Sequence, residues 1–321
     1  MITFLVQALK DLGSFWGALL GAVLSALITW YFSARRMPAS YRIAVLGFPK
    51  SGKTTLITAV FAYLFRRGVR GASIVPRGEE TIQRISDNME KLELGRPIGP
   101  TTDQDVFAYR AEVSISGLIF TARYKLEIGD FPGENTVDFA ETYGDWLHRT
   151  KYFEWAVGAD AFVFVLDTGA ILLDESGEYV ARQKRAFRAA WQRLQEHYLD
   201  GPADLSRRPL ILVFTKADSL VFGGTAEELR SATMAKEFAR ATTIPRGQIE
   251  SIGGDIRARL RDLIEYFERE SRRFRVVFTS VFLNVDDERL GIPEVAHYIM
   301  PRPGFFALPV AQPIEKLSAR Q

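Results

Sequence analysis

The sequence predicts an α/β fold with a mostly parallel β-sheet. Residues 41–46 form a short apolar strand that runs into a glycine-rich loop and then into a helix-forming stretch at residues 55–67. Residues 161–166 and 210–214 are almost entirely apolar, which is typical of strands covered on both faces of a parallel sheet. We therefore expect the first strand to lead directly into a helix and the later strands to lie centrally in the sheet.

The loop at residues 47–54 reads Gly-Phe-Pro-Lys-Ser-Gly-Lys-Thr and matches a phosphate-binding loop. Its glycines allow a turn that brings backbone N–H groups close to phosphates at a helix N-terminus. Lys53 would then reach the β- and γ-phosphates, and Thr54 would hold Mg²⁺. The alternative is a glycine-rich turn with a buried lysine. The residues predicted to contact phosphate are Gly47, Pro49, Lys50, Ser51, Gly52, Lys53, Thr54 and Thr55.

Composition excludes several classes of function. The 321 residues could form one large domain or two, and an apolar fraction of 47% is ample for a core. Because 41 basic residues face 39 acidic ones, no nucleic-acid partner is expected. The absence of cysteine excludes disulfides, thiolate metal sites and cysteine catalysis. The three histidines stand far apart and are expected to be ordinary structural or surface residues: His148, His197 and His297.

An apolar segment near the N-terminus predicts a membrane anchor. Residues 12–32 carry no charge, and about 20 helical residues cross a bilayer core. Trp16 and Trp30 would lie at the two interfaces, and the basic pair Arg35 and Arg36 favours a cytoplasmic location for the rest of the chain. The prediction is therefore a single-pass membrane protein that contacts lipid through this segment. A cleaved signal peptide and a buried soluble helix are the alternatives.

Glycines within the same segment suggest self-association. They repeat at a spacing of four, which places them on one helix face where a second helix could approach closely. The alternative is that glycine is simply common in membrane helices. These glycines are Gly13, Gly17 and Gly21. The predicted organisation is a tail at 1–11, the anchor at 12–32, a linker at 33–40, a ligand-binding domain with helical insertions at 41–300 and a tail at 301–321.

The segments after the loop continue the α/β pattern. A helix at 55–67 is expected to end at Gly68, and a more polar helix is expected at 79–94. Residues 106–115 and 119–128 are rich in β-branched and aromatic side chains and predict a β-hairpin.

Polar residues follow three of the predicted strands. Asp130 and Gly133 come after the hairpin, where the aspartate could hold Mg²⁺ through water and the glycine N–H could meet a γ-phosphate. Asp218, after the strand at 210–214, could accept hydrogen bonds from the N1–H and N2–H₂ groups of guanine, while the Lys216 stem packs along the base. Adenine lacks that pair of donors. A last strand at 275–278 leads into a Thr-Ser pair. The alternative for Asp130 and Gly133 is a simple turn, because an Asp-x-x-Gly pattern by itself is more often a turn than a magnesium site.

The order of the motifs GFPKSGKT, DFPG, TKAD and TS resembles that of the Ras-like, TRAFAC-type P-loop GTPases, over about residues 42–280. The resemblance implies a P-loop NTPase three-layer sandwich with the β-hairpin at the edge of the sheet and the ligand across the carboxyl ends of the strands. It implies GTP or GDP as ligand and Mg²⁺ as cofactor. The implied metal ligands are Thr54, Thr101 and Asp130. The further nucleotide contacts are Gly133, Thr215, Lys216, Asp218, Ser280 and Val281.

Three positions decide what the resemblance implies for base recognition and hydrolysis. Thr215 stands where the family more often has Asn, a tolerated variant that modestly weakens the prediction of guanine as the base. Glu134 stands where Ras-like enzymes carry the water-orienting Gln; a carboxylate could accept from water but would repel the γ-phosphate, so hydrolysis could be slow or need a partner. Thr101 is favoured as the switch threonine over Thr102 and Thr81, because Pro100-Thr101 resembles a stretch in bacterial GTPase-like proteins of conflict systems. The catalytic set is then Lys53, Glu134 and Thr101.

The predicted function is a membrane-anchored switch that hydrolyses GTP to GDP and phosphate. An N-terminal anchor on a GTPase resembles the architecture of the signal recognition particle receptor beta subunit. Insertions at 168–209 and 221–274 would carry specificity for a protein partner, and basic helices at 182–198 and 256–267 are either core-packed with solvated charges or in contact with anionic lipid. The alternatives are a hydrolytically weak, nucleotide-bound scaffold that recruits a partner, and an ATPase on the same fold.

Overall fold

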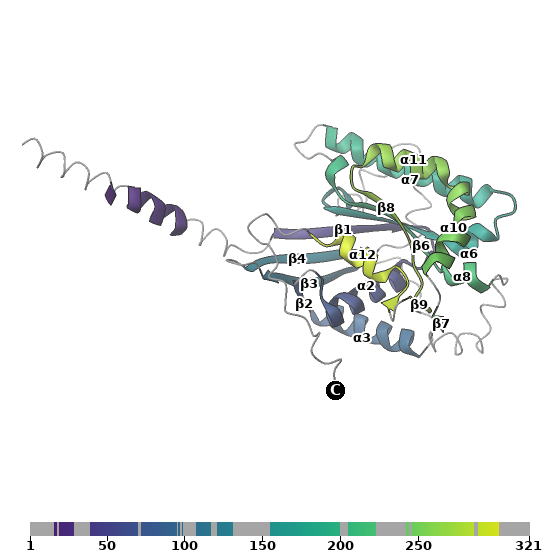
Figure 1. Ribbon diagram of the computed structural model, residues 1–321, viewed down its shortest axis with the longest axis horizontal. Coiled ribbons are helices and arrows are strands. Elements are labelled where there is room, and N and C mark those ends of the chain that lie inside the picture. Colours follow the sequence, from purple (N-terminus) through teal and green to yellow (C-terminus); the bar gives the residue numbers. More distant parts are fainter. Residues whose placement is uncertain are drawn as a thin grey trace, which may run out of the picture.

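The structure is a computed structural model, and a seven-stranded sheet is at its centre (Figure 1). The strands lie in the order β2-β3-β4-β1-β5-β6-β8. Their bounds are β1 Ala39–Gly47, β2 Ala72–Pro76, β3 Phe107–Ser116, β4 Thr121–Asp130, β5 Ala161–Asp167, β6 Leu210–Thr215 and β8 Phe274–Phe278. The structure describes residues 16–17, 19–28, 39–69, 72–94, 96, 98, 107–116, 121–130, 155–199, 205–222, 242–243, 246–285 and 288–301.

The central strands confirm the predicted parallel sheet. β1 pairs in parallel with β4 on one side and with β5 on the other, so that Ile43 lies between Ile128 and Ala161. β5, β6 and β8 continue in parallel. Every residue of β5 and of β6 is buried, as the apolar runs in the sequence indicate. Because these strands run in one direction, their carboxyl ends meet at one edge of the sheet.

The β-hairpin is present, but its predicted place at the edge of the sheet is wrong. β3 and β4 pair antiparallel, and β2 adds a further antiparallel strand outside β3, with Ile74 opposite Val113. Ile74 is buried, whereas Val75 points outward and is 45% exposed, so β2 has the alternation of a half-buried strand. Pro76 ends the strand, which is acceptable because an edge strand does not need every N–H for pairing.

Helices cover both faces of the sheet (Figure 1). On one face Phe164 packs against Phe187 and Phe267, with ring centroids 4.8 and 5.2 Å apart. On the other face Val45 and Val163 belong to a second buried cluster. The first face is covered by α7 Glu178–Leu199, α10 Arg246–Arg259 and α11 Arg261–Glu270, and the second by α2 Lys53–Arg67, α3 Glu79–Glu93 and α12 Ile292–Ile299.

Shorter elements connect these layers. The helix predicted at 256–267 is divided, because α10 ends at Arg259 and α11 begins at Arg261. The remaining elements are α6 Thr168–Leu172, a 3₁₀ turn at Leu205–Arg207, α8 Asp218–Phe222, β7 Thr242–Thr243, β9 Leu283–Val285 and β10 Glu288–Arg289, of which β7, β9 and β10 form a separate small sheet.

The prediction of a membrane anchor is wrong. Among the described residues, none of the helices has both the length and the apolar character to cross a membrane. Within the predicted segment the structure describes residues 16–17 and 19–28, and all of them are helical. The membrane localisation and the lipid contact through residues 12–32 both depended on a helix that crosses the membrane. Gly17 and Gly21 lie in the described helical part, whereas Gly13 lies outside the described residues.

Candidate functional site

The loop between β1 and α2 leaves a helix N-terminus open. Lys50 has a φ of 61° and Gly52 a φ of 83°, so two residues in the left-handed region turn the chain out of the strand and into the helix. Gly52 is the N-cap of α2, and neither a capping side chain nor an acidic residue occupies the first turn. The positive end of the helix dipole and its first N–H groups are therefore not offset by the helix's own side chains, which is typical of an anion-binding helix start.

Lys53 lies folded over this loop. Its side chain is buried, and its Nζ donates hydrogen bonds to the carbonyl oxygens of Gly47 at 2.8 Å and Phe48 at 3.0 Å. These contacts hold the ammonium group within the turn instead of in solvent. A phosphate seated on the turn would therefore meet a charge that is already in position.

Thr54 and Asp130 meet beneath the loop. The Thr54 hydroxyl donates to the Asp130 carboxylate at 2.9 Å, and Asp130, the last residue of β4, is fully buried. A hydroxyl and a carboxylate oxygen next to a phosphate-binding turn are donors that suit Mg²⁺. Among the described residues, no cluster of three acidic or histidine side chains could hold a metal alone. A magnesium ion here would need phosphate oxygens or water to complete its shell.

The end of β6 is tied to the same loop. Lys216 has a φ of 55°, and its Nζ donates to the Lys50 carbonyl oxygen at 2.8 Å and pairs with the Asp167 carboxylate at 2.5 Å. The Thr215 hydroxyl lies 2.5 Å from the carbonyl oxygen of Ser51. Thr215 thus fixes the loop before α2 from the strand end, a task for which a short hydroxyl side chain suffices.

Asp218 and Ser280 form a buried pair. Asp218 is 9% exposed, and its carboxylate accepts a hydrogen bond of 2.7 Å from the Ser280 hydroxyl. The same hydroxyl accepts from the backbone N–H groups of Phe282 and Leu283. Burial raises the pKa of Asp218, and the hydrogen bond from Ser280 acts in the opposite direction. One carboxylate oxygen is thus held by Ser280, which fixes the orientation of the group.

Several predicted site residues cannot be placed. Thr101, Gly133 and Glu134 lie outside the described residues, as does Thr102. Thr81 is described, and its hydroxyl is buried in α3, where it accepts from the Arg110 N–H at 3.4 Å. That contact joins α3 to the hairpin and gives Thr81 a structural place.

Sequence reasoning missed Asp167. It is buried at the end of β5, pairs with Lys216, and accepts from the Ala170 N–H at 3.1 Å as the N-cap of α6. The available signal was its position directly after an apolar strand, the same position that Asp130 has after β4.

Gly47 is the residue at which a side chain would disturb the loop most directly. A Cβ atom there would lie 2.8 Å from both the Ser51 hydroxyl and the Val165 carbonyl oxygen. We expect Gly47→Ala to lower the free energy of unfolding by about 1–3 kcal/mol, measured by urea denaturation of the full chain. Gly254→Ala is the control, because nothing lies within 4 Å of a Cβ at that position in α10. Equal stability of the two variants would contradict this close packing.

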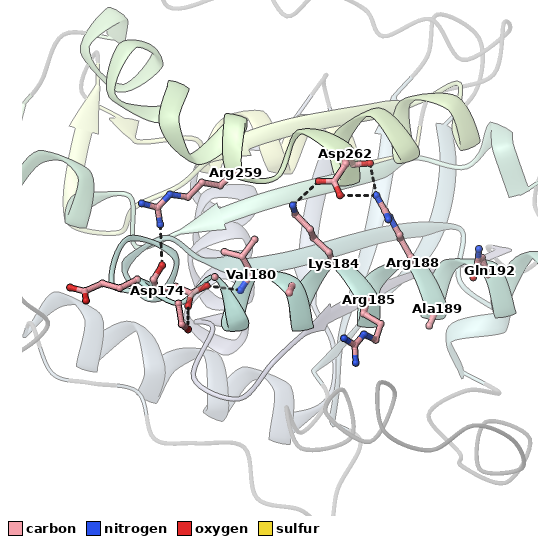
Figure 2. A pocket seen from close by; sticks show the side chains of 13 residues that line it. Asp174, Val180, Lys184, Arg185, Arg188, Ala189, Gln192, Arg259 and Asp262 are labelled. Carbon is pink, nitrogen blue, oxygen red and sulfur yellow. Dashed lines mark hydrogen bonds and ion pairs between the residues drawn. The ribbon is translucent and has the colours of Figure 1, made fainter.

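A larger cavity lies away from this site. It measures about 870 Å³, opens beside α7 and is lined by Lys184, Arg188, Arg259 and Asp262 (Figure 2). Lys184 and Arg188 converge on the Asp262 carboxylate at 2.7 and 3.2 Å, and Arg259 donates to the Asp174 carbonyl oxygen at 3.4 Å. Burial acts to raise the pKa of Asp262, but the hydrogen bond and charge of Lys184 lower it overall. Size alone does not make this the functional site, because none of the residues that line it belongs to the motifs for phosphate, magnesium or base.

The fold and the site together are typical of α/β proteins that bind a phosphorylated ligand at the carboxyl ends of parallel strands. No family model matches this sequence, and no curated protein matches it. Among solved structures, the chain is similar to one from the signal recognition particle receptor SRb-GTP/SRX complex of Chaetomium thermophilum. The identity is 15%, the match covers 82% of this chain and 98% of that chain, and the TM-score is 0.39.

Proposed function

We propose that this protein binds GTP with Mg²⁺ and hydrolyses it to GDP and phosphate as a conformational switch. The observation that carries the proposal is the buried Asp218 carboxylate, which Ser280 holds two positions after Lys216. The Lys216 Nζ donates to the Lys50 carbonyl oxygen in the loop before α2, so a site for a base and a site for phosphates would lie on one edge of the sheet.

The phosphate end of the nucleotide would lie on the turn before α2. The N–H groups at the open helix start would bind phosphate oxygens, with Lys53 beside the β- and γ-phosphates. Thr54 and Asp130 would hold Mg²⁺, which neutralises charge on the phosphates. When phosphate binds, the Lys53 ammonium group would exchange its hydrogen bonds to the loop carbonyl oxygens for hydrogen bonds to phosphate oxygens. Hydrogen bonds between two charged groups are stronger than those to a neutral carbonyl.

The guanine end would lie against β6 and the turn after β8. The Asp218 carboxylate would accept from N1–H and the amino group through the oxygen that Ser280 does not hold, and the Lys216 stem would lie along the ring. Ser280 and Val281 would border the base. Adenine presents no matching donors, so ATP would leave the buried carboxylate unpaired.

Hydrolysis would use residues outside the described part of the chain. Water attacks the γ-phosphorus, and the bond to the β–γ bridging oxygen breaks. Glu134 would orient that water, the Gly133 N–H and Thr101 would contact the γ-phosphate, and Lys53 would stabilise charge on the bridging region. Loss of the γ-phosphate would release the Thr101 and Gly133 segments, which is the switch. Because Glu134 repels the γ-phosphate, we propose that a protein partner accelerates the reaction.

Competition and single-turnover measurements on the purified chain test the function. GTP is expected to displace a labelled guanine nucleotide at least about 10²-fold better than ATP, the ratio that one set of unpaired polar groups supports. Equal competition by ATP would overturn the assignment of the base. Preloaded GTP is expected to release phosphate in a single turnover. Binding without any release would favour the scaffold over the enzyme.

A further inference from the structure

A second cavity, of about 290 Å³, lies at the far end of α2 from the phosphate loop. It is enclosed by the last turns of α2 and α3, the β9–β10 hairpin and the start of α12. Arg66 follows Lys53 by 13 positions in the same helix, which places it about 20 Å along the axis. This cavity is therefore separate from the site proposed for the nucleotide.

The polar wall of the cavity has more positive than negative side chains. Arg66 pairs with Glu93 at 2.5 Å, and Arg67 pairs with Glu288 at 2.9 Å. The third guanidinium, of Arg289, makes no ion pair with a carboxylate among the described residues. Among the described side chains that line the cavity, one positive charge is thus left over when each carboxylate is matched with one guanidinium.

Arg289 is fixed where that charge faces the cavity. Its Nη1 donates to the Val281 carbonyl oxygen at 2.8 Å, which anchors the guanidinium at one side. Burial lowers the pKa of Arg289, and the nearby positive charge of Arg66 lowers it further, against the opposite effect of Glu93. An anion in the cavity would relieve both effects, because it would replace lost solvation and separate two like charges.

Helix dipoles account for the position of two of the three arginines at the cavity. Arg66 and Arg67 lie in the last turn of α2, where basic side chains offset the negative end of the dipole. Arg289 is in β10 and has no helix end of its own to neutralise. Arg289 is partly buried next to Arg66, and Glu93 offsets only part of the lowering of its pKa, so an added anion would be a favourable partner.

The remaining wall is apolar. Met89 and Leu92 of α3 and the buried Ile292 of α12 line the cavity together with the arginines. A volume near 300 Å³ is at the small end of ligand pockets. We propose that this cavity binds a small organic oxyanion, with a phosphoryl or carboxylate group held by Arg66 and Arg289 and a short apolar body against α3 and α12. Guanidinium groups match both kinds of oxyanion through paired hydrogen bonds.

The test is calorimetry on the full chain at constant ionic strength, with phenyl phosphate in one arm and benzoate in the other. Arg66→Gln is expected to weaken binding roughly tenfold or more, because a charge-assisted hydrogen bond is lost. The matched control is Arg77→Gln, since Arg77 pairs with Glu112 at 2.6 Å and is exposed to a similar extent, 62% against 59% for Arg66. The control is expected to bind as the unmodified chain does.

Two further variants make the result decisive. Arg289→Lys keeps the positive charge but loses the paired donors of the guanidinium, so it is expected to weaken binding of the probe. Its melting temperature is expected to fall by no more than that of Arg66→Gln. Lys53→Ala identifies an anion that has entered the phosphate loop instead. Binding that Lys53→Ala removes and Arg66→Gln leaves intact would overturn the proposal. So would equal losses in Arg66→Gln and Arg77→Gln, or no binding of either probe at millimolar concentration.

Discussion

Lys53→Ala is expected to abolish nucleotide binding, with a loss of affinity of about 10²-fold or more. The side chain is buried in the loop and bonded to two of its carbonyl oxygens, so its ammonium group is positioned before any ligand arrives. Alanine removes charge-assisted hydrogen bonds to two phosphates, each worth about 1.5–3 kcal/mol. The measurement is calorimetric titration of the purified chain with GTP and Mg²⁺.

The fold must be shown to survive this change. Gly47 and Phe48 lose a hydrogen-bond donor in the variant, so circular dichroism and thermal melts should accompany the titration. Lys91→Ala is the control, because Lys91 is exposed on α3. GTP affinity that is unchanged in Lys53→Ala would refute the phosphate site, whereas a loss in both variants would point to a general effect of charge.

Local patterns in the sequence were sufficient for the centre of the fold. The apolar runs that became β5 and β6 indicated buried parallel strands, and the helix predicted at 79–94 is α3 at Glu79–Glu93. These predictions worked because each depends on residues close together in the chain. The same holds for the strand–loop–helix unit, in which the ends of β1 and α2 differ from the expected bounds by at most two residues.

Contacts between distant segments were not accessible in this way. β2 is a strand because Ile74 meets Val113 across the sheet, and five residues ending in proline gave little indication of it. The anchor illustrates the opposite error: an uncharged apolar run suggested a spanning helix, but among the described residues no helix is both long enough and apolar enough to cross a membrane.

The candidate site shows the same division. Lys53, Thr54 and Asp218 were predicted from motifs, because each motif fixes a residue type at a strand end or helix start, and their contacts with a nucleotide stay a prediction. Asp167 and Arg289 were missed, because the contacts that give them their roles come from the folded chain. Asp167 pairs with Lys216, which is distant in sequence, and Arg289 donates to the Val281 carbonyl oxygen. A buried carboxylate after an apolar strand is a signal that could be used more generally.

Asp218→Asn is expected to change the base that the protein prefers. Asparagine has nearly the shape of aspartate and can still accept the hydrogen bond from Ser280, but it turns one acceptor into a donor. That donor would face the amino group of guanine, so GTP affinity should fall about 10–100-fold. Xanthine carries an oxygen in place of the amino group and should bind the variant better than guanine does.

Stability is not expected to account for that change. Burial raises the pKa of Asp218, which means that the charged form is disfavoured in the fold, and a neutral amide removes this cost. Asp167→Asn is the matched control, because Asp167 is also a buried strand-end carboxylate and asparagine can keep its capping role. The control should weaken GTP and XTP alike through Lys216, whereas Asp218→Asn should reverse their order. An equal loss of affinity for GTP and XTP in Asp218→Asn would show that the base does not contact this carboxylate.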